Sequence, residues 1–132
     1  MFGIDSTPDG WRVTVSREIE ADADEVWRIL TDTHEWRSWG VTVVDVESNR
    51  RYIEEGTEGK VEVVGGFELP FRITYCDGKR WSWKVAKIPA TGHSVEPVNE
   101  TKSVAKFEIP PAMAGYSPVC MKALKNIEKL AQ

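Results

Sequence analysis

The sequence predicts an α+β domain in which one antiparallel sheet carries helices on a single face. The middle of the chain consists of segments that alternate apolar and polar residues and are joined by short turns, which is typical of antiparallel strands. In each segment the apolar side chains share one face, so the sheet has one side that needs a cover. Residues 117–130 have the apolar spacing of an amphipathic helix, and we expect this helix to cover that side.

The composition is that of a single soluble domain. The chain has 132 residues, of which 41% are hydrophobic and 29% charged, and we interpret residues 1–132 as one domain with residues 1–9 as a loose lead-in. No apolar run approaches the ~18 residues that span a bilayer, and no signal peptide is recognisable, so we expect no integral membrane association and a cytoplasmic location. The net charge of −4 disfavours nucleic acid as a partner, and we expect a monomer or a homodimer.

No metal site and no cofactor are expected from the residue pattern. Two histidines and two isolated cysteines, Cys76 and Cys120, do not have the spacing of a zinc site. The sequence also lacks the glycine motifs that bind phosphates and dinucleotides. We interpret both cysteines as buried apolar side chains or free thiols.

The first strand and the first helix have clear boundaries. Residues 11–20 alternate as a half-buried strand does, with Arg17 as the one polar residue on its apolar face. Asp22 is placed to cap the helix that follows, and Glu25 is placed to complete a capping box. Residues 31–33, Thr-Asp-Thr, end this helix.

A second short helix and two strands follow. Residues 35–40 carry two tryptophans and end in a glycine, which predicts a short helix with a glycine at its end. Residues 41–46 and 57–64 are apolar on one face, so we interpret both as strands.

Residues 67–86 form the most informative part of the chain, a long predicted hairpin. Asp77 and Gly78 supply the residues of a tight turn between its two strands. The strand alternation gives this hairpin an aromatic-rich face that must either be covered or bind something. The positions expected on that inward face are Phe67, Leu69, Phe71, Ile73, Tyr75, Trp81, Trp83 and Val85.

Two further strands and the terminal helix complete the predicted fold. The strands lie at residues 91–97 and 101–109, and Phe107 falls on the apolar face of the second. The two prolines at residues 110–111 stop the sheet. The helix at residues 117–130 has one apolar face and one face rich in lysine.

Two parts of this sequence resemble the START-like (SRPBCC) superfamily, most closely its polyketide cyclase/dehydrase-like group. They are residues 19–32 with the following Glu-Trp-Arg-Ser-Trp at 35–39, and the closing Ala-Leu-Lys-Asn-Ile at 123–127. The resemblance implies a helix-grip fold, in which a curved antiparallel sheet of about six to seven strands wraps a C-terminal helix and leaves a cavity. Members of this superfamily hold lipids, sterols or polyketides there, and some catalyse cyclisation or dehydration. The predicted terminal helix is shorter than in many relatives, which favours a small or open cavity.

His93 is the first candidate for chemistry. It shares strand phase with Val95, so it faces the core if Val95 does. An imidazole on an apolar wall can act as a general acid or base on a bound carbonyl compound. The alternatives are a buried neutral histidine bonded to a neighbour, or a histidine exposed by an irregularity of the strand near Gly92.

Five aromatic residues are candidates for contact with a ligand. Tyr75 can offer its hydroxyl to a polar group of the ligand, or join the histidine as an acid–base pair. Trp83 can stack on a ring, and Trp39 resembles the family tryptophan that closes one end of the cavity. Phe71 and Phe107 lie on the same predicted face. Each of the five can instead be a core residue beneath the terminal helix.

Three other residues have a possible place at the cavity. Met113 and Tyr116, in the proline-rich segment before the last helix, can form a gate over its mouth, or can simply anchor an ordinary connection. Arg17 has an inward phase and can bind a carboxylate inside the cavity, or bend toward solvent at the end of its strand.

The pattern leaves three hypotheses for function. The first is binding of a hydrophobic or aromatic small molecule between the sheet and the terminal helix. The second is a cyclase/dehydrase-like enzyme that uses His93, with Tyr75, as acid–base groups. The third is a protein-interaction module that meets a partner chain through its aromatic surface or its hairpin.

Overall fold

The computed structural model describes residues 2–132 and confirms the α+β class and the helix-grip fold. Eight strands form one sheet, and three α-helices and one 3₁₀ helix accompany it. In chain order the elements are β1 (Phe2–Thr7), β2 (Gly10–Ile19), α1 (Ala23–Thr31), α2 (Trp36–Trp39), β3 (Val43–Ser48), β4 (Glu58–Val63), β5 (Phe67–Cys76), β6 (Arg80–Val85), β7 (Ile88–Pro97), β8 (Ser103–Ile109), η1 (Pro111–Tyr116) and α3 (Ser117–Ala131).

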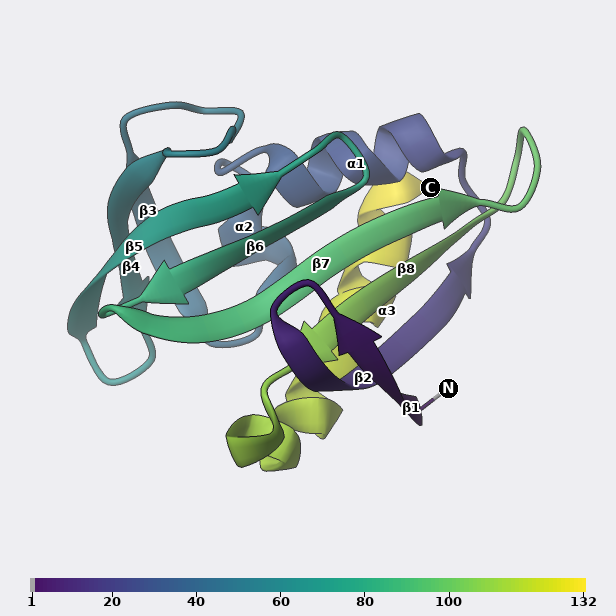
Figure 1. The fold of residues 1–132 in the computed structure, drawn as a ribbon. Coiled ribbons are helices and arrows are strands. Elements are labelled where there is room, and N and C mark those ends of the chain that lie inside the picture. The colour runs from purple at the N-terminus through teal and green to yellow at the C-terminus, as the bar shows by residue number, and fades with distance from the viewer. Residues whose placement is uncertain (1) are drawn as a thin grey trace.

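The sheet is antiparallel throughout, in the order β1-β2-β8-β7-β6-β5-β4-β3. Because β2 and β3 lie near opposite edges of this sheet, α1 and α2 connect them across one face. Figure 1 shows all three helices on that same side of the curved sheet. The terminal helix α3 packs on β2 and β8 and against α1 and α2, so the inner face near β4 to β7 lies beside α3 rather than beneath it.

The first strand corrects the prediction for the N-terminus. We expected residues 1–9 to be a loose lead-in, but residues 2–7 form β1, which pairs with β2 from Phe2 opposite Val15 to Thr7 opposite Gly10. The turn residues before Gly10, which has a φ of +103°, therefore join two strands instead of preceding one. This extra strand brings the sheet to eight strands instead of six or seven.

The predicted hairpin is present, but its alternation reverses at Thr74. The turn contains Gly78 with a φ of +95°, and Ile73 pairs with Trp83 as expected. The next pair is Tyr75 with Ser82, so Thr74 is an extra residue, a β-bulge. Because directly opposite residues share a face, the bulge turns Tyr75 away from the inner side. The expectation that Tyr75 points inward is therefore wrong.

A second irregularity lies between β6 and β7. Ser82 pairs with Gly92 and Lys84 with Pro89, so two residues of β7, Ala90 and Thr91, lie opposite the single Trp83. The strand begins at Ile88, earlier than the predicted residue 91. The turn that joins β6 to β7, residues 86–87, has positive φ at both positions although neither residue is a glycine. The sequence therefore lacked the usual signal for this turn.

The two tryptophans of α2 tie this short helix to the end of α1. The indole nitrogen Nε1 of Trp36 donates to the carbonyl of Leu30 over 3.0 Å, and Nε1 of Trp39 donates to the carbonyl of Ile29 over 3.2 Å. These carbonyls belong to the last turn of α1 and lack partners within that helix. The ring of Trp36 then stacks on Trp81 of the sheet, 5.2 Å between centroids. The aromatic face of the hairpin is in this way covered by α2.

None of the helices in residues 2–132 is long and apolar enough to cross a membrane.

Candidate functional site

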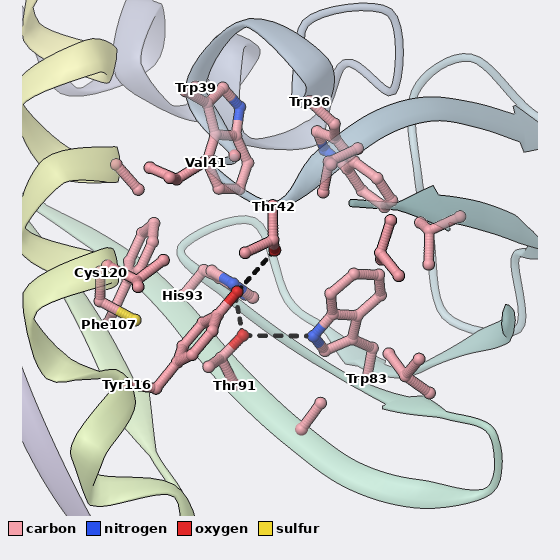
Figure 2. A pocket seen from close by; sticks show the side chains of 18 of the residues that line it. Trp36, Trp39, Val41, Thr42, Trp83, Thr91, His93, Phe107, Tyr116 and Cys120 are labelled. Carbon is pink, nitrogen blue, oxygen red and sulfur yellow. Dashed lines mark hydrogen bonds between the residues drawn. The ribbon is translucent and has the colours of Figure 1, made fainter. Parts of the chain in front are cut away.

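A cavity of about 240 Å³ lies between the inner face of the sheet, the loop after α2 and the start of α3. Its walls come from α2, from residues 40–43, from β4 to β8, and from η1 and α3. Figure 2 shows that the side chains of these separate elements converge on one space. Val41 and Met113 line it and are also partly exposed, 44% and 37%, so they mark its mouth.

Aromatic side chains form a large part of the apolar wall. Trp39 of α2 packs edge-on against Phe107 of β8, with 5.6 Å between ring centroids. Trp81 and Trp83 of β6 meet nearly at right angles, 5.5 Å apart. Such edge-to-face contacts hold the rings at fixed angles. The cavity therefore offers flat apolar surfaces in several orientations.

One polar chain runs along the floor of the cavity, through the bulge between β6 and β7. Nε1 of Trp83 donates to Oγ1 of Thr91 over 3.3 Å, and Oγ1 of Thr91 lies 3.0 Å from Nε2 of His93. An indole N–H can only donate, so Thr91 accepts from Trp83 and has its own proton to give. We assign that proton to the hydrogen bond with Nε2 of His93. The second ring nitrogen, Nδ1, has no hydrogen-bond partner in residues 2–132.

His93 is an uncharged part of this wall. It is 2% exposed and stacks on Trp81, with 3.9 Å between ring centroids. Burial lowers the pKa of His93 to about 3, against a smaller opposing effect of the Trp81 backbone. The imidazole is therefore neutral near pH 7 and has no imidazolium proton to give to a ligand.

A second polar pair spans the cavity at the level of the mouth. The hydroxyl of Tyr116, at the end of η1, lies 2.6 Å from the hydroxyl of Thr42, in the loop after α2. Both residues line the cavity, and Figure 2 shows the two oxygens directed toward each other. This hydrogen bond joins two segments that lie 74 positions apart in the sequence.

The cavity lining carries no formal charge in the described part of the chain. Burial raises the pKa of the Cys120 thiol to about 12, so this wall residue is also neutral near pH 7. No group of three histidine, cysteine, aspartate or glutamate side chains that could hold a metal is present within residues 2–132. The site is consequently suited to an uncharged, largely apolar molecule.

The structure brings together most of the residues singled out in the sequence. Those that line the cavity are Trp39, Trp83, His93, Phe107, Met113 and Tyr116. Phe71 is 4% exposed and packs against Trp36 and Trp83, with centroids 5.5 and 5.7 Å away, outside the lining. It is a core residue behind the wall.

Tyr75 and Arg17 lie outside the cavity. The hydroxyl of Tyr75 donates to Asp77 over 2.7 Å, and its ring lies beneath the guanidinium of Arg80, 5.4 Å away. The proposed acid–base pair of Tyr75 with His93 therefore does not converge. Arg17 forms an ion pair with Glu128 of α3 over 2.8 Å and does not line the cavity.

Sequence reasoning missed the two threonines of the site. Thr91 has the same strand phase as His93, so the alternation in β7 contained a signal for it. Thr42 lies in a loop, where no periodicity indicates the direction of a side chain.

Comparisons with known proteins agree with this fold. Residues 10–125 match the model of a family described as polyketide cyclase/dehydrase and lipid transport. No curated protein matches the chain.

Three solved structures illustrate the structural similarity. XoxI from Bacillus cereus has a TM-score of 0.70 at 12% identity, over 89% of this chain and 93% of its own. The Zhui aromatase/cyclase from Streptomyces sp. R1128 has a TM-score of 0.67 at 14% identity, over 91% and 92%. A point mutant of Thalictrum flavum norcoclaurine synthase, in complex with a transition-state analogue, has a TM-score of 0.59 at 14% identity, over 99% and 96%. At these identities the similarity shows a shared fold.

Proposed function

Because this chain belongs to the polyketide cyclase/dehydrase and lipid transport family, we propose that it binds an uncharged hydrophobic or aromatic small molecule in the cavity beside α3. The observation that carries this proposal is the cavity itself, whose walls are mostly apolar, include several aromatic rings, carry no charge and come from both the sheet and the helices. An apolar molecule that leaves water for this space gains about 25 cal/mol for each Å² of apolar surface buried. Shape and ring stacking then select among apolar molecules.

The size of the cavity supports a small ligand. Its volume of about 240 Å³ is below the ~300–1,000 Å³ of typical sites for drug-sized ligands. An apolar cavity of roughly 150 Å³ is enough to hold benzene. A molecule of one or two rings therefore fits, whereas a sterol or a diacyl lipid needs more room than this cavity provides.

A cyclase or dehydrase function is the second candidate, and it has less support. The pair of His93 and Tyr75 that would carry acid–base chemistry is not assembled, because Tyr75 bonds to Asp77 outside the cavity. His93 remains in the wall, but its low pKa makes it a weak base. The aromatase/cyclase and the synthase among the structural neighbours share the fold at 14% identity.

An interaction module is the third candidate. It was based on the aromatic surface of the hairpin, and Trp36 of α2 packs directly on that surface, against Trp81 and Phe71. This cover favours a ligand-binding cavity over a protein-binding face at this place.

Binding can be tested with naphthalene as a probe and tryptophan fluorescence as the readout. Since four tryptophans line the cavity, we expect a saturable change in emission of the wild-type protein. The cavity-filling variant Ala90→Phe places a ring inside the same space, so it should remove the response while the protein remains folded. The matched control Ala112→Phe adds the same ring at an exposed position of η1 that does not line the cavity.

The control should bind naphthalene as the wild type does. The proposal is wrong if the wild-type protein gives no saturable response, or if Ala90→Phe and Ala112→Phe bind equally well.

A further inference from the structure

We propose that the ligand carries a hydroxyl or carbonyl oxygen, and that this oxygen accepts a hydrogen bond from the Thr42–Tyr116 hydroxyl pair at the mouth of the cavity. The inference rests on the proposed function, since it concerns the ligand of the same site. It narrows that ligand to an uncharged molecule of one or two rings with one polar end.

The Thr42–Tyr116 pair has a spare proton. Each hydroxyl brings one donor and two acceptor positions, and one of the two protons is used in the 2.6 Å hydrogen bond between them. The structure gives neither hydroxyl another hydrogen bond within residues 2–132. Whichever oxygen acts as donor, the other keeps an unused proton beside the cavity. An acceptor on a ligand can take that proton without breaking the existing bond.

The other polar chain of the cavity offers no such proton to a ligand. The N–H of Trp83 is used on Thr91, and the hydroxyl proton of Thr91 is used on Nε2 of His93. Because Nε2 accepts, the proton of the neutral imidazole lies on Nδ1, which is buried and is not accessible to a ligand. The polar end of the ligand is therefore expected at Thr42 and Tyr116, while its ring lies against Trp83 and Phe107.

The lining as a whole disfavours both a charged ligand and a ligand without any oxygen. It has no charged side chain to pair with an ionised ligand, because His93 and Cys120 are held neutral by burial. A carboxylate would lose its hydration and gain only neutral hydroxyls in return. A plain hydrocarbon would instead leave the spare hydroxyl proton without a partner. A neutral molecule with a single oxygen avoids both costs.

The location of the pair is also suited to recognition during entry. Thr42 follows Val41, and Tyr116 follows Met113 by three residues, and these two apolar neighbours mark the mouth. A ligand that enters ring first would bring its trailing oxygen to the level of the two hydroxyls. The pair therefore forms its hydrogen bond with the end of the ligand that enters last.

The test compares three ligands of equal ring size, namely naphthalene, 2-naphthol and 2-naphthoate, by tryptophan fluorescence at pH 7. We expect wild-type protein to bind 2-naphthol about fivefold more tightly than naphthalene, as one added hydrogen bond gives, and to bind 2-naphthoate at least about tenfold more weakly than naphthalene.

The double variant Thr42→Val and Tyr116→Phe removes both hydroxyls and keeps the shapes of the side chains. It should bind naphthalene at least as tightly as the wild type does, because no hydroxyl proton is left without a partner, and it should lose the preference for 2-naphthol. Each single variant keeps one hydroxyl proton, so it should retain the preference in part. Tyr75→Phe is the matched control, since it removes a tyrosine hydroxyl outside the cavity, and it should behave as the wild type.

Two failures can be told apart in this experiment. If none of the three ligands binds, both the proposed function and this inference are wrong. If naphthalene binds but 2-naphthol gains nothing over it, or the double variant keeps the full preference, the inference alone is overturned. The comparison of ligands on the wild-type protein decides the question even if the double variant does not fold.

Discussion

Among single residues, His93 couples the site most directly to the stability of the fold. Its ring stacks on Trp81, and burial lowers its pKa to about 3, below the ordinary value of 6.5. In the unfolded chain the same ring takes up a proton as the pH falls through 6.5. The unfolded state therefore binds more protons than the folded state in this range. The free energy of unfolding decreases as the pH is lowered.

The contribution of His93 can be measured by urea unfolding at pH 7 and pH 5. From the two pKa values, the free energy of unfolding should fall by about 2 kcal/mol between these pH values through this residue alone. The variant His93→Phe lacks the titrating group and should lose that much less stability over the same range. The control His34→Asn, which replaces the exposed histidine, should follow the wild type. Equal pH dependence in wild type and His93→Phe would show that the ring is not buried and neutral.

The direction of a single side chain could be predicted from the sequence wherever the strand stayed regular. His93 and Phe107 face the cavity because β7 and β8 pair without a break from Gly92 to Pro97. Tyr75 was misplaced because the bulge at Thr74 shifts the phase by one residue. Nothing in the local residue types marks that bulge, since Thr74 is a common strand residue.

At the level of elements, β6, β7 and β8 are joined on the outer face by a buried ion pair that crosses Gly92. Arg80 of β6 bonds to Glu108 of β8 over 2.7 Å, and their side chains are 12% and 4% exposed. Gly92 of β7 lies between them, and a Cβ there would sit 2.8 Å from Glu108 Oε1 and 3.3 Å from Arg80 Nη2. The pair needs a residue without a side chain at this position.

Gly92→Ala should therefore destabilise the protein by about 1–3 kcal/mol, because the added methyl group pushes against a buried ion pair. Urea unfolding measures this difference. Gly115→Ala is the matched control, since a Cβ at Gly115 meets no atom within 4 Å, and its stability should stay within about 0.5 kcal/mol of the wild type. If both variants have the same stability, the close approach at Gly92 does not exist.

The elements themselves were mostly predictable, and the exceptions have physical reasons. The capping aspartate predicted the start of α1, and Asp22 Oδ1 does accept from the backbone N–H of Glu25 over 2.9 Å. The turn at residues 86–87 was not predictable, because Ala and Lys rarely take positive φ. β1 was missed because its side chains are exposed, Phe2 by 64% and Ile4 by 72%. Its short alternation of apolar residues therefore does not mark a buried face of the sheet.

For the molecule as a whole, the arrangement of α3 determines whether there is a cavity. The helix packs over β2 and β8 and against α1 and α2. Its first turns contribute Val119, Cys120 and Ala123 to the lining, and the inner face of β4 to β7 forms the opposite walls. Because α3 covers the part of the sheet around β2 and β8, an apolar space remains between the helix and the inner face of β4 to β7.

The helix-grip fold was predictable from the order of elements and from the resemblance of residues 19–39 and 123–127 to a known superfamily. The volume of the cavity was not, because it depends on how far Trp36 and Trp39 reach over the sheet. Their positions are fixed by hydrogen bonds to two backbone carbonyls at the end of α1. Such contacts between distant elements have no signature in the local sequence.

The central claim, that the space beside α3 holds the ligand, is tested most directly by nuclear Overhauser effects between bound naphthalene and the protein. The account predicts cross-peaks from the ligand to Val119, Phe107 and Trp83, which line the cavity, and none to Tyr75, whose ring lies outside it. Cross-peaks confined to exposed side chains such as Phe67 or Trp11, with none to the lining, would contradict it.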